Sequence, residues 1–66
     1  MNECLLNWMD NNTKIVVKFK YGDSVYEYYG YIKTFSEIGV TIITNESPGN
    51  RNRMFPWTSV VYIEEI

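Results

Sequence analysis

The chain contains no histidine and only one cysteine, Cys4. Without histidine, the Ser-His-Asp and Cys-His arrangements of nucleophilic catalysis are excluded, and a zinc ion would find almost no ligands. A single cysteine also excludes an intrachain disulfide. We therefore expect a protein that is not an enzyme and that holds neither a metal nor a cofactor.

Long apolar runs are missing as well. The longest comprise a few residues, whereas a membrane-spanning helix needs about 20. The first residues lack the basic flank and the apolar stretch that are typical of a signal peptide. These absences lead us to expect a cytoplasmic protein with no membrane partner.

The 66 residues that are present are 45% hydrophobic, 17% aromatic and 21% charged, with a formal net charge of −2. This composition predicts one globular domain over residues 1–66. In so short a chain burial barely offsets conformational entropy, so self-association is the expected source of further burial. The negative balance argues against non-specific binding of duplex DNA. The lysine stripe of Lys14, Lys18 and Lys20 is nevertheless locally basic.

Residues 1–12 have a helical pattern. Leu5 and Met9 lie four residues apart, so they share one side of a short helix with Trp8, and polar residues 10–12 end it. A helix of this length is marginal on its own. We expect this side to dock as a lid over the rest of the domain.

Residues 14–64 change to a period of two and predict a β-barrel. Gly22 supplies the first turn, and Gly30 lies inside the second strand, where glycine marks a bulge or a bend. The predicted strands cover residues 14–21, 25–35, 40–44, 54–55 and 60–64, and a polar loop covers 45–53.

The segment at 54–64 reads Met-Phe-Pro-Trp-Thr-Ser-Val-Val-Tyr-Ile-Glu. It resembles the end of bacterial and phage Sm-like (LSM) proteins, a family of small SH3-like β-barrels. The helix, the strand at 15–19, the turn at Gly22 and the bent strand at Gly30 follow in the same order. The resemblance implies a strongly bent five-stranded barrel whose fourth strand pairs with the fifth strand of a neighbour, which closes a homo-oligomeric ring.

The resemblance also implies an RNA site. In the family an Asp and an Asn flank the turn between the second and third strands, and an Arg-Gly pair precedes the last strand. Those positions correspond here to Ser36, Gly39 and Pro56-Trp57. The chain therefore departs from the family pattern at the site, and Ser36 and Trp57 stand as candidate ligand-binding positions.

Four tyrosines surround Gly30, and their rings could stack on bases. Core and cross-strand packing is the ordinary alternative. We expect Tyr29 and Tyr31 to pack inside, and Tyr26 and Tyr28 to be more open and available to a ligand.

Arg51 and Arg53 lie in the predicted polar loop between asparagines. Guanidinium groups bind phosphate bidentately, so this loop could hold a nucleotide, within reach of Trp57 if it folds back. A polar loop without a site is the alternative.

Together these features predict a non-catalytic, ring-forming protein that binds RNA or a small nucleotide at subunit interfaces. The alternative is a small phage or mobile-element accessory protein that acts on a host protein as an interaction or inhibitor module.

Overall fold

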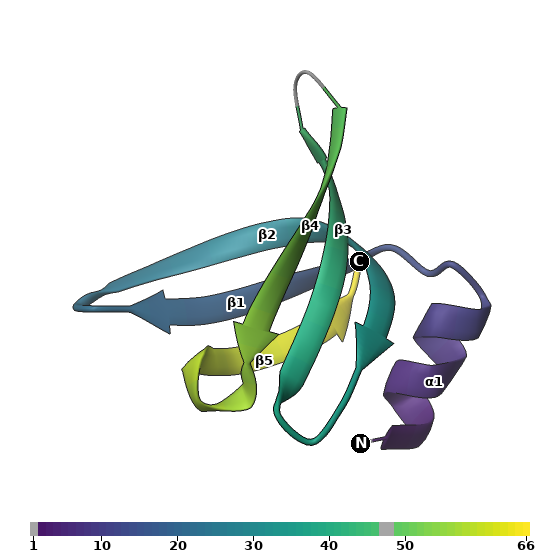
Figure 1. The fold of residues 1–66 in the computed structure, drawn as a ribbon, viewed down its shortest axis with the longest axis horizontal. Coiled ribbons are helices and arrows are strands. Elements are labelled where there is room, and N and C mark those ends of the chain that lie inside the picture. Colours follow the sequence, from purple (N-terminus) through teal and green to yellow (C-terminus); the bar gives the residue numbers. More distant parts are fainter. Residues whose placement is uncertain (1, 47–48) are drawn as a thin grey trace.

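The computed structural model describes residues 2–46 and 49–66 (Figure 1). Met1, Ser47 and Pro48, the last two from the predicted polar loop, lie outside the described residues. The elements are, in order, α1 (Asn2–Asp10), β1 (Ile15–Tyr21), β2 (Ser24–Phe35), β3 (Gly39–Glu46), β4 (Gly49–Pro56), the 3-10 helix η1 (Trp57–Ser59) and β5 (Val60–Glu65).

The five strands form one antiparallel sheet in the order β4-β3-β2-β1-β5. The sheet is bent so strongly that β3 and β4 cross over β1 and β5 (Figure 1). The predicted fold, a short helix followed by a small, bent five-stranded β-barrel, is confirmed at this level. Among the described residues, β4 pairs only with β3 and β5 only with β1, so the sheet has two open edges.

The helix α1 ends as its sequence predicts. Asn12 has a positive φ of 51°, and the amide of Thr13 donates to the carbonyl of Trp8 over 2.9 Å. This is the Schellman arrangement, in which a left-handed residue lets the next amide cap the last turn. Within the described ranges, no helix is long and apolar enough to cross a membrane.

Strand β2 joins the two halves of the sheet. Its first half pairs with β1 and its second half with β3, and Gly30 is paired on both sides. A Cβ atom at Gly30 would meet the carbonyl oxygen of Ile43, so only glycine lets the two backbones approach this closely. The register shifts between Ile32 and Thr34. The predicted bend is therefore confirmed.

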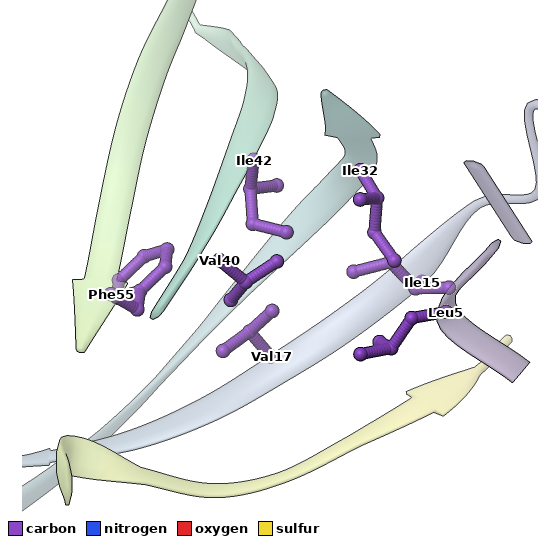
Figure 2. Close-up of a cluster of buried hydrophobic side chains, with 7 residues drawn as sticks. All are labelled: Leu5, Ile15, Val17, Ile32, Val40, Ile42 and Phe55. Carbon is purple, nitrogen blue, oxygen red and sulfur yellow. The ribbon is translucent and has the colours of Figure 1, made fainter. Parts of the chain in front are cut away.

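Seven buried side chains from α1 and four strands form one core (Figure 2). They are Leu5, Ile15, Val17, Ile32, Val40, Ile42 and Phe55. Leu5 is 1% exposed, and Trp8 and Met9 pack against the same cluster. The expected docking of the helix as a lid is confirmed.

Residues 45–46 and 49–53 are not a loop, and those parts of the predicted 45–53 loop are wrong. Residues 45–46 end β3. Residues 49–53 are the first half of β4, and they pair with β3. Backbone ladder bonds do not depend on side-chain polarity, and an edge strand needs only one partner. A polar segment can therefore form a strand when a β-rich neighbour supplies the ladder.

Cross-strand pairing divides the tyrosines of β2 between two faces. Tyr28 is opposite Val17 of the core, so Tyr26 and Tyr28 lie on the inner face. Tyr29 and Tyr31 alternate with them, face away from the core, and are 50% and 40% exposed. The expectation that Tyr29 and Tyr31 pack inside is wrong, because the register of the β1–β2 hairpin places Tyr26 and Tyr28 on the inner face instead.

We predict that Gly30→Ala lowers the free energy of unfolding by about 1–3 kcal/mol, because the new methyl group meets the β3 backbone. Chemical denaturation followed by circular dichroism measures the change. Gly49→Ala is the matched control: a Cβ atom there meets no atom within 4 Å, and we expect a change within about 0.5 kcal/mol. Equal effects of the two substitutions would contradict the close approach at Gly30.

Candidate functional site

Four aromatic rings gather on the inner face, around the part of β1 that leads to the hairpin tip. Phe19 stacks on Tyr28 with ring centroids 5.5 Å apart and on Tyr26 at 5.6 Å. Phe55 of β4 tilts against Phe19 at 4.8 Å and against Tyr28 at 5.7 Å. Offset and tilted geometries of this kind are favourable for aromatic pairs. The cluster therefore links the β1–β2 hairpin to the open edge of the sheet.

Arg53 completes this cluster with a positive charge. Its Cζ atom lies 4.6 Å from the centroid of the Tyr28 ring, which is a cation–π contact. Arg53 is half-buried, and the register of β4 places it two residues before Phe55, on the same inner face. The strand holds the guanidinium group in place, whereas a loop residue would have to be ordered on binding.

A cleft of about 510 Å³ opens beside the Tyr28 and Arg53 side chains. The residues that line it are Phe19, Lys20, Tyr21, Tyr28, Asn52, Arg53, Met54, Phe55, Pro56 and Ser59. We call it the Tyr28–Arg53 cleft. It combines aromatic faces with two cationic side chains and one amide side chain.

The chemistry of this cleft suits a flat ring that carries an anionic group. The exposed Tyr21 and the half-buried Phe19 and Tyr28 offer aromatic surfaces, and Arg53 and Lys20 can donate hydrogen bonds to phosphate oxygens. Asn52 offers both a donor and an acceptor to the edge of a base. Stacking together with charge is how proteins bind single-stranded nucleotides without a catalytic group.

Ser36 and Trp57 lie together, but away from this cleft. The indole Nε1 of Trp57 donates to the carbonyl of Ser36 over 2.7 Å. The hydroxyl of Ser36 accepts from the amide of Ile38, and the carbonyl of Ile38 accepts from the amide of Trp57. These bonds tie the β2–β3 turn to η1. The hollow that these two residues line with Phe35 and Glu37 shares no lining residue with the Tyr28–Arg53 cleft.

Arg51 is an exposed residue of β4 and does not line the cleft. Its carbonyl accepts a hydrogen bond from the hydroxyl of Thr44 over 3.3 Å. Of the six residues predicted for the site, the structure therefore brings together Tyr26, Tyr28 and Arg53. Trp57 and Ser36 form a separate pair, and Arg51 stands apart from both groups.

A second, mostly apolar groove of about 490 Å³ lies between α1, η1 and the β5 strand. Its lining residues are Cys4, Leu5, Trp8, Trp57, Val60, Val61, Tyr62 and Ile63. The indole Nε1 of Trp8 donates to the Oε1 atom of Glu65 over 3.2 Å, which joins the helix to the end of β5. The groove therefore runs beside an open edge of the sheet.

No group of three or more acidic, cysteine or histidine residues in the described part of the chain is placed to hold a metal ion. Comparisons with protein families, with curated proteins and with solved structures find no match for this chain.

Phe19, Lys20 and Phe55 belong to the cleft and were not among the predicted site residues. A signal for Phe19 was present in the sequence. A two-residue turn at Gly22-Asp23 sets Phe19 opposite Tyr26, so their rings had to share a face. No sequence pattern predicts that Phe55 joins these rings, because its position beside them depends on the bend of β2 and on the pairing of β4 with β3.

We predict that Arg53→Ala lowers the free energy of unfolding by roughly 0.5–1 kcal/mol, because the guanidinium group loses its contact with the Tyr28 ring. Thermal unfolding of the variant measures the loss. Arg51→Ala is the control on the same strand and should change stability by less than about 0.5 kcal/mol, since its side chain is exposed. A larger loss for Arg51→Ala would contradict the placement of these two arginines.

Proposed function

We propose that the protein is a non-catalytic binding protein of Sm-like type that takes a nucleotide-type ligand, RNA or a small nucleotide, in the Tyr28–Arg53 cleft. The observation that carries the proposal is the Arg53 guanidinium group held 4.6 Å from the Tyr28 ring within a cluster of aromatic side chains. The base of the nucleotide stacks on the exposed aromatic surface of the cleft, and the phosphate of the same nucleotide binds Arg53 and Lys20.

The proposal includes self-association through the two open edges of the sheet. The edge strand β4 is basic in its first half, with Arg51 and Arg53, and apolar at Met54 and Phe55. The edge strand β5 has the reverse order.

In β5 the apolar residues Val60 and Val61 come first, and Glu64 and Glu65 follow. Antiparallel pairing of β4 from one copy with β5 of the next sets arginines against glutamates and apolar residues against each other. Complementary charges fix the register of such a contact. Because β4 and β5 are different surfaces, the contact is head-to-tail, and its repetition closes a ring when the rotation between neighbouring copies divides a full turn. It also covers both open edges, which are otherwise templates for aggregation.

Nucleotide binding is tested by calorimetry with uridine 5′-monophosphate, adenosine 5′-monophosphate and the corresponding nucleosides. We predict that Arg53→Ala weakens binding of the monophosphates by roughly tenfold or more, since a charge-assisted hydrogen bond is lost. Binding of the nucleosides should change little, because they have no phosphate for Arg53 to contact.

Arg51→Ala is the matched control and should leave all four affinities unchanged, because Arg51 does not line the cleft. Failure of the wild-type protein to bind any monophosphate or any oligonucleotide would sink the proposal. Equal weakening of nucleosides and monophosphates in Arg53→Ala would show that Arg53 acts through packing alone.

Assembly is tested by reversing the charges of the two edges. We predict that Arg51→Glu and Glu64→Lys each reduce the oligomer population in native mass spectrometry, because each sets like charges across the β4–β5 contact. The double variant Arg51→Glu/Glu64→Lys restores opposite charges and should recover assembly. A wild-type protein that stays monomeric at tens of micromolar, in both sedimentation and native spectra, rules out the ring.

The second candidate function is the interaction or inhibitor module. It is favoured by the apolar groove between α1 and β5, because an extended segment of another protein could add to the β5 edge and place apolar side chains in that groove. The assembly experiment separates the two candidates. A ring occupies the β5 edge of every copy, whereas a monomer leaves this edge open to a partner.

A further inference from the structure

The outer face of the sheet carries its own group of exposed tyrosines and lysines. On β2 these are Tyr29 and Tyr31, and on β5 it is Tyr62, which is 37% exposed. Lys18 of β1 lies on the strand between β2 and β5: its cross-strand partners are Glu27 and Tyr62, and its Nζ atom lies 5.5 Å from the Tyr62 ring centroid. Strands β2, β1 and β5 are neighbours in the sheet (Figure 1), and strand alternation directs these side chains to its outer face.

Two further lysines border the same surface. Lys14 is exposed and precedes Ile15, whose partner on β2 is Gly30, so Lys14 lies level with Tyr31. Lys33 is exposed and follows Tyr31 by two residues, at the register shift of β2. We call the surface formed by Tyr29, Tyr31, Tyr62, Lys14, Lys18 and Lys33 the tyrosine–lysine face.

The charge of the outer face is opposite to that of the whole chain. Strand alternation puts Lys18 and Lys20 on it, and Lys20 also borders the cleft; Lys14 directly precedes β1, and Lys33 lies at the register shift of β2. The acidic residues among the described strand positions of this face are Glu27 and Glu64. Positive groups outnumber these two glutamates only when the bordering Lys14 and Lys33 are counted with Lys18 and Lys20, although the net charge of the chain is −2.

We propose that the tyrosine–lysine face binds single-stranded nucleic acid, with bases stacked on the tyrosines and phosphates bound by the lysines. Tyr29 and Tyr31 are two residues apart on one strand, about 6.6 Å at 3.3 Å per residue. This spacing lets two successive bases of an extended strand stack on them. Exposed aromatic side chains on a sheet, bordered by cations, are the usual platform for unpaired bases.

The lysines favour a nucleic acid over a protein as the occupant. Tyrosine is enriched in both kinds of interface, but lysine is depleted in the centres of protein–protein interfaces. Here Lys18 lies in the middle of the surface, with its ammonium group against Tyr62. A phosphate backbone makes use of such a charge, whereas a protein partner would have to bury it.

The proposal takes its ligand class from the proposed function, but it depends on different residues. It also extends that function, because two bases stacked side by side on this face make the ligand a polymer and not a single nucleotide. Wild type and variants are compared by fluorescence anisotropy with labelled oligouridine and oligoadenosine about 12 nucleotides long, a length that covers a small single-strand site. Uridine 5′-monophosphate is measured in parallel.

We predict that Tyr29→Ala/Tyr31→Ala weakens oligonucleotide binding by at least about tenfold, because a stacking ring contributes roughly that factor. Binding of the mononucleotide should stay within twofold, since neither residue lines the cleft. The matched control Tyr29→Phe/Tyr31→Phe keeps the rings and should retain the oligonucleotide affinity. Both tyrosines are exposed, and circular dichroism verifies that each variant is folded.

The lysines are tested through the salt dependence of binding. Lys14→Gln/Lys33→Gln should reduce the slope of log K against log salt concentration by about 0.7 for each phosphate contact that is lost. An unchanged slope would contradict the role of these two lysines.

Three other outcomes overturn the proposal. If the alanine pair leaves oligonucleotide affinity unchanged while Arg53→Ala weakens it, the cleft binds and the face does not. If no probe binds to the wild type, the proposed function fails together with the face. If the alanine pair alters the sedimentation coefficient but not the oligonucleotide affinity, the tyrosines form a protein interface.

Discussion

The close backbone approach at Gly30 is the constraint on which this fold depends. A methyl group there would meet the Ile43 carbonyl oxygen, so a side chain would push β3 away from β2. With glycine, one strand pairs with β1 along its first half and with β3 along its second. The bend turns Ile32 and Ile42 toward Ile15 and Leu5 (Figure 2). A chain of 66 residues thus obtains a closed core from a single sheet and one helix.

Successive side chains of β2 around this glycine point to opposite faces of the sheet, and this alternation decides what each face can bind. Tyr28 shares its face with Val17 and closes the core beside Arg53. Tyr29, the next residue, stands outside among lysines. One alternating sequence therefore supplies an aromatic–guanidinium cleft on one side and a tyrosine–lysine face on the other. A shift of one residue in the β1–β2 register would exchange the two surfaces.

Much of this fold could be predicted from the sequence, because local signals are strong where one face is buried. The alternation of apolar and polar residues, the turn at Gly22 and the bend at Gly30 are sufficient to predict the first three strands. The faces of Tyr29 and Tyr31 were predictable too, since the Gly22 turn fixes the hairpin register. Of the strand at Gly49–Pro56, residues 54–55 are predicted, but its polar first half is not predictable, because polar edge residues have no period that marks a core.

The candidate site is likewise predictable from the sequence only in part. Tyr26, Tyr28 and Arg53 came together as parts of one site, but the partners Phe19 and Phe55 depend on how three strands meet in space. Ser36 and Trp57 were chosen by resemblance to a family. In the structure they hold the β2–β3 turn against η1 through backbone and indole hydrogen bonds. In this structure both residues therefore hold a turn in place.

The pairing of β1 with β5 has a consequence for synthesis on the ribosome. β1 can form its hairpin with β2 soon after both have emerged, but its other ladder waits for Val60–Glu65. Until then one side of β1 is an unpaired edge, and the core lacks the cover that Val60 and Ile63 give it. Trp8 likewise has no Glu65 to bond. The nascent chain thus remains open along β1 until β5 leaves the exit tunnel, and during this interval the unpaired edge and the exposed core favour misassembly between neighbouring nascent chains.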